Sequence, residues 1–215
     1  GLSGQLLIYL FTFISIGIYL FIIRWKKIPF SEKETKIYNA DFWLYIGVFT
    51  LILMSFQVIL PTSIPVYNAI VEFFGGFSNL APPAEKEIFY SNAQIWFASS
   101  LAIFSSIAQV LWWRKNKSKN IVSLFSNPLA ITLVLSSLVI YIYPITKPSY
   151  MILLTASIFS IFSNGSVLIY FVRKKDLISS ASVSHIGLAV MLIGILFSSG
   201  YSSIVSKTYT GLVCI

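Results

Sequence analysis

The residues from Tyr150 to Lys175 read YMILLTASIFSIFSNGSVLIYFVRKK. No charged side chain occurs from Tyr150 to Val172, and three basic residues follow directly. The hydrocarbon core of a bilayer is about 30 Å thick, and a helix of roughly 20 apolar residues crosses it. This stretch therefore predicts a membrane-spanning helix that ends in a basic turn.

Apolar runs of comparable length recur on both sides of this segment. They predict six transmembrane helices, at approximately Leu6 to Ile23, Phe42 to Leu60, Ala93 to Trp113, Leu129 to Tyr143, Tyr150 to Val172 and Val183 to Ser199. The composition agrees, because 57% of the 215 residues are hydrophobic, 10% are charged and the mean hydropathy is +0.84. Soluble domains hold about 25% charged residues. We predict an all-α, polytopic integral membrane protein, with a single membrane domain over residues 1–215.

Lysine and arginine indicate which span ends face the cytoplasm, because cytoplasmic loops retain basic residues. Five basic residues follow the first span, four the third and three the fifth, which together are 12 of the 15 in the chain. They are Arg24, Lys26, Lys27, Lys33, Lys36, Arg114, Lys115, Lys117, Lys119, Arg173, Lys174 and Lys175. The asymmetry predicts that the segment from Pro61 to Asn92 and the C-terminal tail are periplasmic, in the inner membrane of a bacterium. The lysine and arginine residues occur in short clusters between apolar runs, and this distribution argues against nucleic-acid binding despite the net charge of +8.

The two ends of the chain lie in or beside apolar sequence, and all three methionines are internal. We therefore expect a fragment of a longer protein. Cys214 is the only cysteine, so the sequence carries no disulfide framework.

Few polar side chains lie within the spans. Asp41 stands at the edge of the second span, where a helix N-cap explains it, and no acidic residue lies mid-span, which argues against a proton-coupled or cation-coupled transporter. Gln57, Gln109 and Asn164 are neutral amides, which hold helices together more often than they bind substrate. The five tryptophans lie near span ends, and we interpret them as belt residues of the headgroup layer.

His185 is the only histidine, and it lies near the cytoplasmic start of the sixth span. An imidazole in lipid is costly unless it pairs, ligates a metal or reaches the interface. Gly187, Met191 and Gly194 follow at spacings of four and three, which places small and adaptable side chains on one helix stripe. Such a stripe lets a partner helix or a flat macrocycle approach closely. From the residues alone, heme ligation stays open beside an interfacial histidine next to an ordinary packing seam.

The outer segment from Pro61 to Asn92 is longer than a plain connection, and loops of that size are usually functional. It contains an apolar stretch through Phe74, a Pro-Pro pair and a late aromatic group. These aromatic residues predict docking on the bilayer surface or on a bound partner. A re-entrant loop that only covers the helix ends is the other interpretation.

Taken together, these segments resemble the CcmF/NrfE-type heme lyases of bacterial cytochrome c maturation. The resemblance rests on an outer Pro-Pro segment with an aromatic-Asn pair after it, a span that closes on a basic turn and a His-x-Gly helix. The residues that carry it are Ala81 to Pro83, Tyr90 to Asn92, Trp112 to Lys115 and His185 to Gly194. Ala81 replaces the family's glycine, and the family's tryptophan-rich periplasmic motif and its other histidines have no counterpart here.

The resemblance implies covalent attachment of heme to apocytochrome c on the periplasmic side, with a transmembrane heme b that relays electrons from quinol. His185 would be one axial ligand of the heme iron. The implied cofactor-binding residues are His185, Gly187, Met191 and Gly194, and the implied outer-chamber residues are Pro82, Pro83, Tyr90 and Asn92. The implied partners are a heme-delivering chaperone, an apocytochrome c, other maturation subunits and membrane lipid.

An alternative from another class is a non-catalytic membrane scaffold or a carrier of a neutral hydrophobic solute. In that case His185 would serve packing or the interface. The sequence assigns no catalytic residue, because it holds no phosphate-binding loop, no nucleophile with a base and no carboxylate pair.

Overall fold

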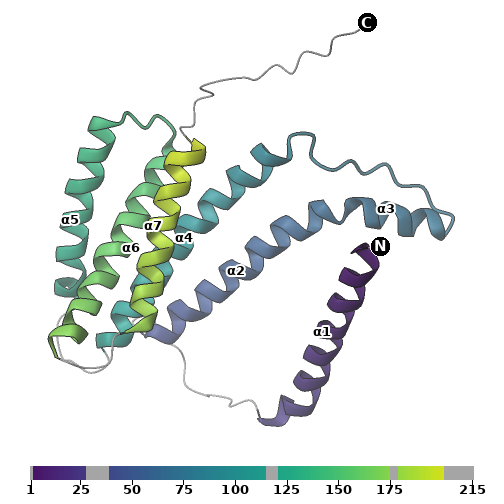
Figure 1. The fold of residues 1–215 in the computed structure, drawn as a ribbon, viewed down its shortest axis with the longest axis horizontal. Helices are drawn as coiled ribbons and strands as arrows, with labels where there is room; N and C mark the ends of the chain where they lie inside the picture. Colours follow the sequence, from purple (N-terminus) through teal and green to yellow (C-terminus); the bar gives the residue numbers. More distant parts are fainter. Residues whose placement is uncertain (1, 28–38, 115–120, 175–178, 201–215) are drawn as a thin grey trace, which may run out of the picture. The chain divides into compact units, whose positions relative to one another are not determined.

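A computed structural model describes residues 2–27, 39–114, 121–174 and 179–200 of the chain. Its regular elements, in chain order, are α1 (Leu2–Arg24), the short 3-10 helix η1 (Trp25–Lys27), α2 (Ala40–Thr62), α3 (Ile64–Phe73), α4 (Lys86–Arg114), α5 (Ile121–Ile142), α6 (Pro148–Arg173) and α7 (Ser180–Gly200) (Figure 1). No strand occurs within these ranges. The predicted all-α fold class is confirmed.

Five of the described helices, α2, α4, α5, α6 and α7, are long and apolar enough to cross a membrane. The chain is therefore a multi-pass membrane protein, as its composition predicted. Each helix begins earlier than its predicted span, and the difference is largest for two of them: α4 begins at Lys86, and α5 begins at Ile121 and continues through Pro128. A helix begins where its backbone hydrogen bonds can form, whereas a span begins where side chains become apolar, so the two boundaries differ.

The chain divides into two compact units, residues 1–35 and residues 36–215. The described part of the first unit is α1 with η1, which corresponds to the first predicted span. The second unit holds the other six helices. The single membrane domain over residues 1–215 stays a prediction.

Helix α6 forms the centre of the second unit. It packs against α4, α5 and α7, and α4 packs in turn against α2. Figure 1 shows that α4 and α6 run opposite to α5 and α7, so the basic ends of α4 and α6 lie at the same end of the bundle as the start of α7. Arg173 and Lys174 are the described residues of the last basic cluster. Several residues used in the predictions above lie outside the described residues: Lys33, Lys36, Lys115, Lys117, Lys119, Lys175, Cys214 and the C-terminal tail.

Small polar residues occupy the contact between α4 and α6. Ser106 on α4 and Ser160 and Asn164 on α6 are almost fully buried. The Asn164 Nδ2 donates to the Ser160 carbonyl at 2.9 Å and to the Ser106 Oγ at 3.3 Å. Small side chains allow two membrane helices to approach closely, and amides hydrogen-bond across them. The predicted structural role of Asn164 agrees with this geometry.

A second amide contact joins α2 to α4. The Gln94 Nε2 donates to the Gln57 Oε1 at 2.8 Å, so Gln57 also acts between helices. The N-cap assigned to Asp41 is wrong. Asn39 occupies the N-cap position, and its Nδ2 donates to the Asp41 Oδ2 at 2.9 Å, while Asp41 itself lies in the first helical turn.

The irregular part of the predicted outer loop is shorter than the segment from Pro61 to Asn92 that the sequence predicted. Helix α3 occupies its first third and α4 its last residues, which leaves residues 74–85 without regular structure. Pro82 and Pro83 lie in this irregular segment, whereas Tyr90 and Asn92 lie in the first turns of α4. The difference arises because both segments can form a helix. Pro65 lies in the first turn of α3, where proline is tolerated, and the Lys86–Asn92 sequence holds no proline or glycine.

The irregular segment folds back onto α3. The Asn68 Nδ2 donates to the Leu80 carbonyl at 2.8 Å, and the Ser78 Oγ donates to the Asn68 Oδ1 at 2.7 Å. Gly75 makes the reversal with a φ of +75°, a left-handed conformation that favours glycine. Asn68 therefore pins the segment at two points.

Replacing Gly75 with alanine is expected to loosen this segment by about 1 kcal/mol, because a Cβ in the left-handed region is strained. Limited proteolysis within residues 74–85 should then be about fivefold faster, which is the population change that such a free energy produces. Gly17→Ala is the control, since a Cβ there meets nothing within 4 Å. Equal cleavage rates for the parent and Gly75→Ala would contradict the strained turn.

Candidate functional site

A cavity of about 720 Å³ lies between α2, α4, α6 and α7. His185, the sixth residue of α7, forms part of its wall and is half-buried. The cavity belongs to the end of the bundle where α6 ends and α7 begins. The other lining residues are Trp43, Leu44, Gly47, Val48, Leu51, Leu101, Ser105, Ala108, Gln109, Trp112, Phe171, Ser179, Ser180, Ala181 and Leu188.

His185 points into this cavity because of its place on the helix. The buried residues of α7 include Ser182, Ala189 and Leu192. At about 100° per residue, all three lie within roughly 60° of His185 around the helix axis. The imidazole is therefore on the face that packs on the bundle, and among the described residues it has no hydrogen-bond partner.

A polar cluster next to His185 joins α4 to the start of α7. The Gln109 Nε2 lies 3.1 Å from the Ser179 Oγ and 3.2 Å from the Ser182 Oγ, and it donates to both. The Ser182 Oγ donates to the Ser179 Oγ at 3.1 Å. The sequence favoured a structural role for Gln109, and these bonds between helices confirm it. The same bonds hold the start of α7, and with it His185, against α4.

Aromatic rings form two further walls of the cavity. Trp112 of α4 stacks on Phe171 of α6, with ring centroids 6.4 Å apart and planes 27° apart. Trp43 of α2 forms the second aromatic wall of the cavity. From the sequence alone these tryptophans are expected only as belt residues, and their part in the cavity is visible only in the structure. Ser105, Gln109 and Trp112 are spaced at four and three residues, which places them on one face of α4.

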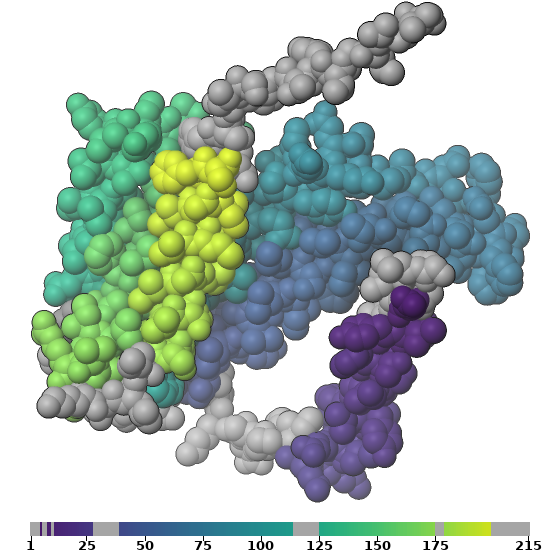
Figure 2. Space-filling model, in the orientation of Figure 1, coloured from purple at the N-terminus to yellow at the C-terminus, as the bar shows by residue number. Residues whose placement is uncertain are grey.

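The glycine and methionine stripe does not share this cavity. Gly187, Met191 and Gly194 lie roughly 120° to 180° around the helix from His185. All three are exposed, and a Cβ built on either glycine meets nothing within 4 Å. Figure 2 shows a long open face of α7, drawn in yellow. The structure thus separates His185 from the residues that were grouped with it, and one flat ligand on His185 in this cavity would not lie along the stripe.

The outer residues are also distant from His185. Asn92 and Gln109 are both on α4, and the 17 residues that separate them correspond to roughly 26 Å along the helix. Tyr90 lies farther still from Gln109, and Pro82 and Pro83 precede the helix. The candidate outer residues and His185 therefore belong to opposite ends of the bundle.

The cavity fits one side of a heme. Its volume is within the range of about 300–1,000 Å³ typical of small-molecule sites. Apolar and aromatic side chains form most of the wall, and His185 supplies an imidazole, which is a common axial ligand of heme iron. The described lining contains no second histidine and no methionine or cysteine, so His185 is its single candidate for an axial ligand.

The described residues hold no group of three histidine, cysteine, aspartate or glutamate side chains that could bind a metal ion. Comparisons with protein-family models, with curated proteins and with solved structures found no match to this chain.

Proposed function

We propose that the chain is part of a heme-handling membrane protein of cytochrome c biogenesis, in which His185 ligates a heme b. The half-buried imidazole on the wall of a largely apolar, partly aromatic cavity is the observation that carries the proposal. The resemblance to the heme lyases supplies the reaction: attachment of heme to apocytochrome c on the periplasmic side, with heme b relaying electrons from quinol. A heme-delivering chaperone and other maturation subunits would be the partners.

In this proposal the residues of the chain bind and orient. Neutral His185 would offer one ring nitrogen to the iron, which requires that the nitrogen carry no proton. Gln109 would keep the imidazole in place indirectly, through its bonds to Ser179 and Ser182 at the start of α7. Trp43 and the stacked Trp112 and Phe171 would exclude water from the flat faces of a macrocycle. Heme itself supplies the one-electron chemistry when bound.

A reduced-minus-oxidised visible spectrum of the purified full-length protein tests the proposal. We expect a b-type signal in the parent and at least a tenfold smaller signal in His185→Ala at equal protein recovery. Ser180→Ala changes an exposed residue of the same cavity and serves as the matched control, with an expected signal equal to that of the parent. A parent without heme, or a His185→Ala spectrum equal to the parent spectrum, would remove His185 as a ligand.

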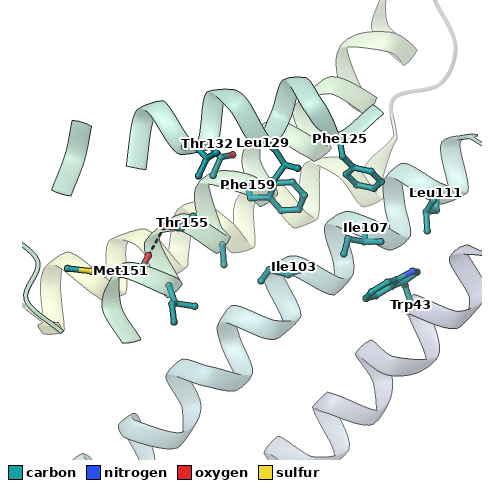
Figure 3. A pocket seen from close by; sticks show the side chains of 13 residues that line it. Trp43, Ile103, Ile107, Leu111, Phe125, Leu129, Thr132, Met151, Thr155 and Phe159 are labelled. Carbon is teal, nitrogen blue, oxygen red and sulfur yellow. Dashed lines mark hydrogen bonds between the residues drawn. The ribbon is translucent and has the colours of Figure 1, made fainter. Parts of the chain in front are cut away.

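A carrier or scaffold for a neutral hydrophobic solute is the second candidate, and a separate apolar cavity favours it. This cavity of about 620 Å³ lies between α4, α5 and α6, with Trp43 at one side (Figure 3). Its polar side chains, Thr132 and Thr155, donate to carbonyls of their own helices at 2.6 and 2.8 Å. Mass spectrometry of molecules extracted from the pure protein tests it. A neutral apolar molecule retained by the parent and lost in Ile152→Trp, which narrows the cavity, would support this function.

A further inference from the structure

Helix α3 follows the membrane-spanning helix α2 almost without a break. Only Ser63 separates Thr62, the last residue of α2, from Ile64, the first of α3. The chain therefore continues as a helix directly after the apolar helix α2. Figure 1 shows α3 lying across the direction of α6 and α7. This placement keeps the whole of α3 close to the level at which α2 ends.

The two sides of α3 differ. On one side, Asn68 binds the irregular segment, and a Cβ at Gly76 would come within 2.8 Å of the Val71 Cγ1, so the segment is packed closely there. The other side carries Val66, Ile70 and Phe73, which are all exposed. A helix of a soluble protein turns its apolar side to the core, whereas α3 turns it away from the rest of its unit.

The exposed apolar side chains of α3 and of the turn that follows it are strongly aromatic and almost uncharged. Phe73, Phe74 and Phe77 are 84%, 81% and 85% exposed, and we call these three residues, with Val66 and Ile70, the phenylalanine patch. Glu72 is the only charged residue between positions 61 and 84. It lies roughly 100° around the helix from Phe73. The patch therefore presents no ionic group to whatever covers it.

We propose that the phenylalanine patch is an interfacial anchor that inserts into the boundary between headgroups and acyl chains of the bilayer. The continuity with α2 places the patch next to the membrane surface, and the pinned segment 74–85 holds Phe77 beside α3. A helix with one apolar side binds in the plane of the interface through its buried apolar area. The rest of the irregular segment, residues 78–85, with its backbone carbonyls and prolines, would face the aqueous phase. This inference is independent of heme binding.

Site-specific fluorescence in proteoliposomes tests the anchor. The full chain carries Cys214→Ser, which leaves each introduced cysteine as the only thiol. Phe73→Cys and Phe77→Cys are labelled with an environment-sensitive fluorophore, and Ala84→Cys, exposed in the same irregular segment, is the control. The vesicles consist of phosphatidylcholine, with or without bromine on the acyl chains.

We expect bromolipid to quench the labels at positions 73 and 77 at least threefold more than the label at position 84. Iodide in the buffer should show the opposite order. Equal iodide quenching at all three positions would overturn the anchor and would leave the patch as a surface for a protein partner. Because all three positions are exposed, folding can be checked in each variant by its elution as one species in detergent.

Discussion

Replacing Ser106 with leucine is expected to prevent α4 and α6 from packing together. Ser106 has no exposed surface, its Oγ donates to the Ala102 carbonyl at 2.6 Å, and the same Oγ accepts from the Asn164 Nδ2 at 3.3 Å. A larger side chain in a closely packed core costs about 1–3 kcal/mol. The loss of a partner for the buried amide adds roughly 1–3 kcal/mol. We therefore expect the variant to lose about 2–6 kcal/mol of its free energy of unfolding.

Unfolding of the reconstituted protein by a denaturing detergent, followed by circular dichroism, measures this loss. Ser137→Leu is the matched control, because Ser137 is exposed on α5 and leucine is favourable on a lipid-facing surface. We expect this control to unfold within about 0.5 kcal/mol of the parent, as surface changes usually do. A Ser106→Leu protein as stable as the control would show that the α4–α6 contact is not close-packed.

Replacing Asn164 with aspartate is expected to have the second-largest effect. The change keeps the shape of the side chain but puts a carboxylate at a position with no exposed surface, between two membrane-spanning helices. A carboxylate cannot donate the hydrogen bonds that the amide Nδ2 makes to the Ser160 carbonyl, the Ser160 Oγ and the Ser106 Oγ, and its oxygens would instead face the acceptor carbonyl of Ser160. An aspartate at the centre of a membrane helix costs about 2.5–3.5 kcal/mol.

We expect Asn164→Asp to lose that amount of unfolding free energy at neutral pH in the same detergent titration. Asn79→Asp makes the identical chemical change at an exposed position of segment 74–85 and should cost less than about 0.5 kcal/mol. If both variants unfolded together with the parent, the buried position of Asn164 would be wrong. If both lost the same amount, the effect would come from the added charge and not from burial.

The local sequence predicts the membrane-spanning helices better than the other helices of this chain. Hydropathy and length identified the spans because crossing a bilayer imposes both on a continuous segment. The same reasoning placed the start of the fourth span after Pro128, whereas α5 begins at Ile121. It treated Ile64 to Phe73 as part of a loop, although these residues form α3. Residues that are less apolar, or too few to span, can still be helical, and hydropathy says nothing about them.

The candidate site was harder to predict than the spans. His185 was identified because a histidine is conspicuous in an apolar run, but its neighbours were assigned along its own helix. In the structure, the residues that share its cavity come from other helices: Gln109 and Trp112 from α4, Phe171 from α6 and Trp43 from α2. The spacing of Gly187, Met191 and Gly194 was correct as a stripe, and yet the stripe lies on the other side of α7.

The sequence by itself therefore determined an all-α membrane protein, the approximate place of five of the six predicted spans and the basic ends of alternate helices. Only the tertiary structure decided which side of each helix faces the bundle, and hence that His185 joins a cavity while the glycine stripe stays open. The physical reason is that lipid and a protein core are both apolar. A helix in a bilayer has no polar side to mark its outside, so its periodicity does not show where its neighbours are. Those neighbours are fixed by contacts such as Gln109 with Ser182 and Asn164 with Ser106, between residues far apart in the chain.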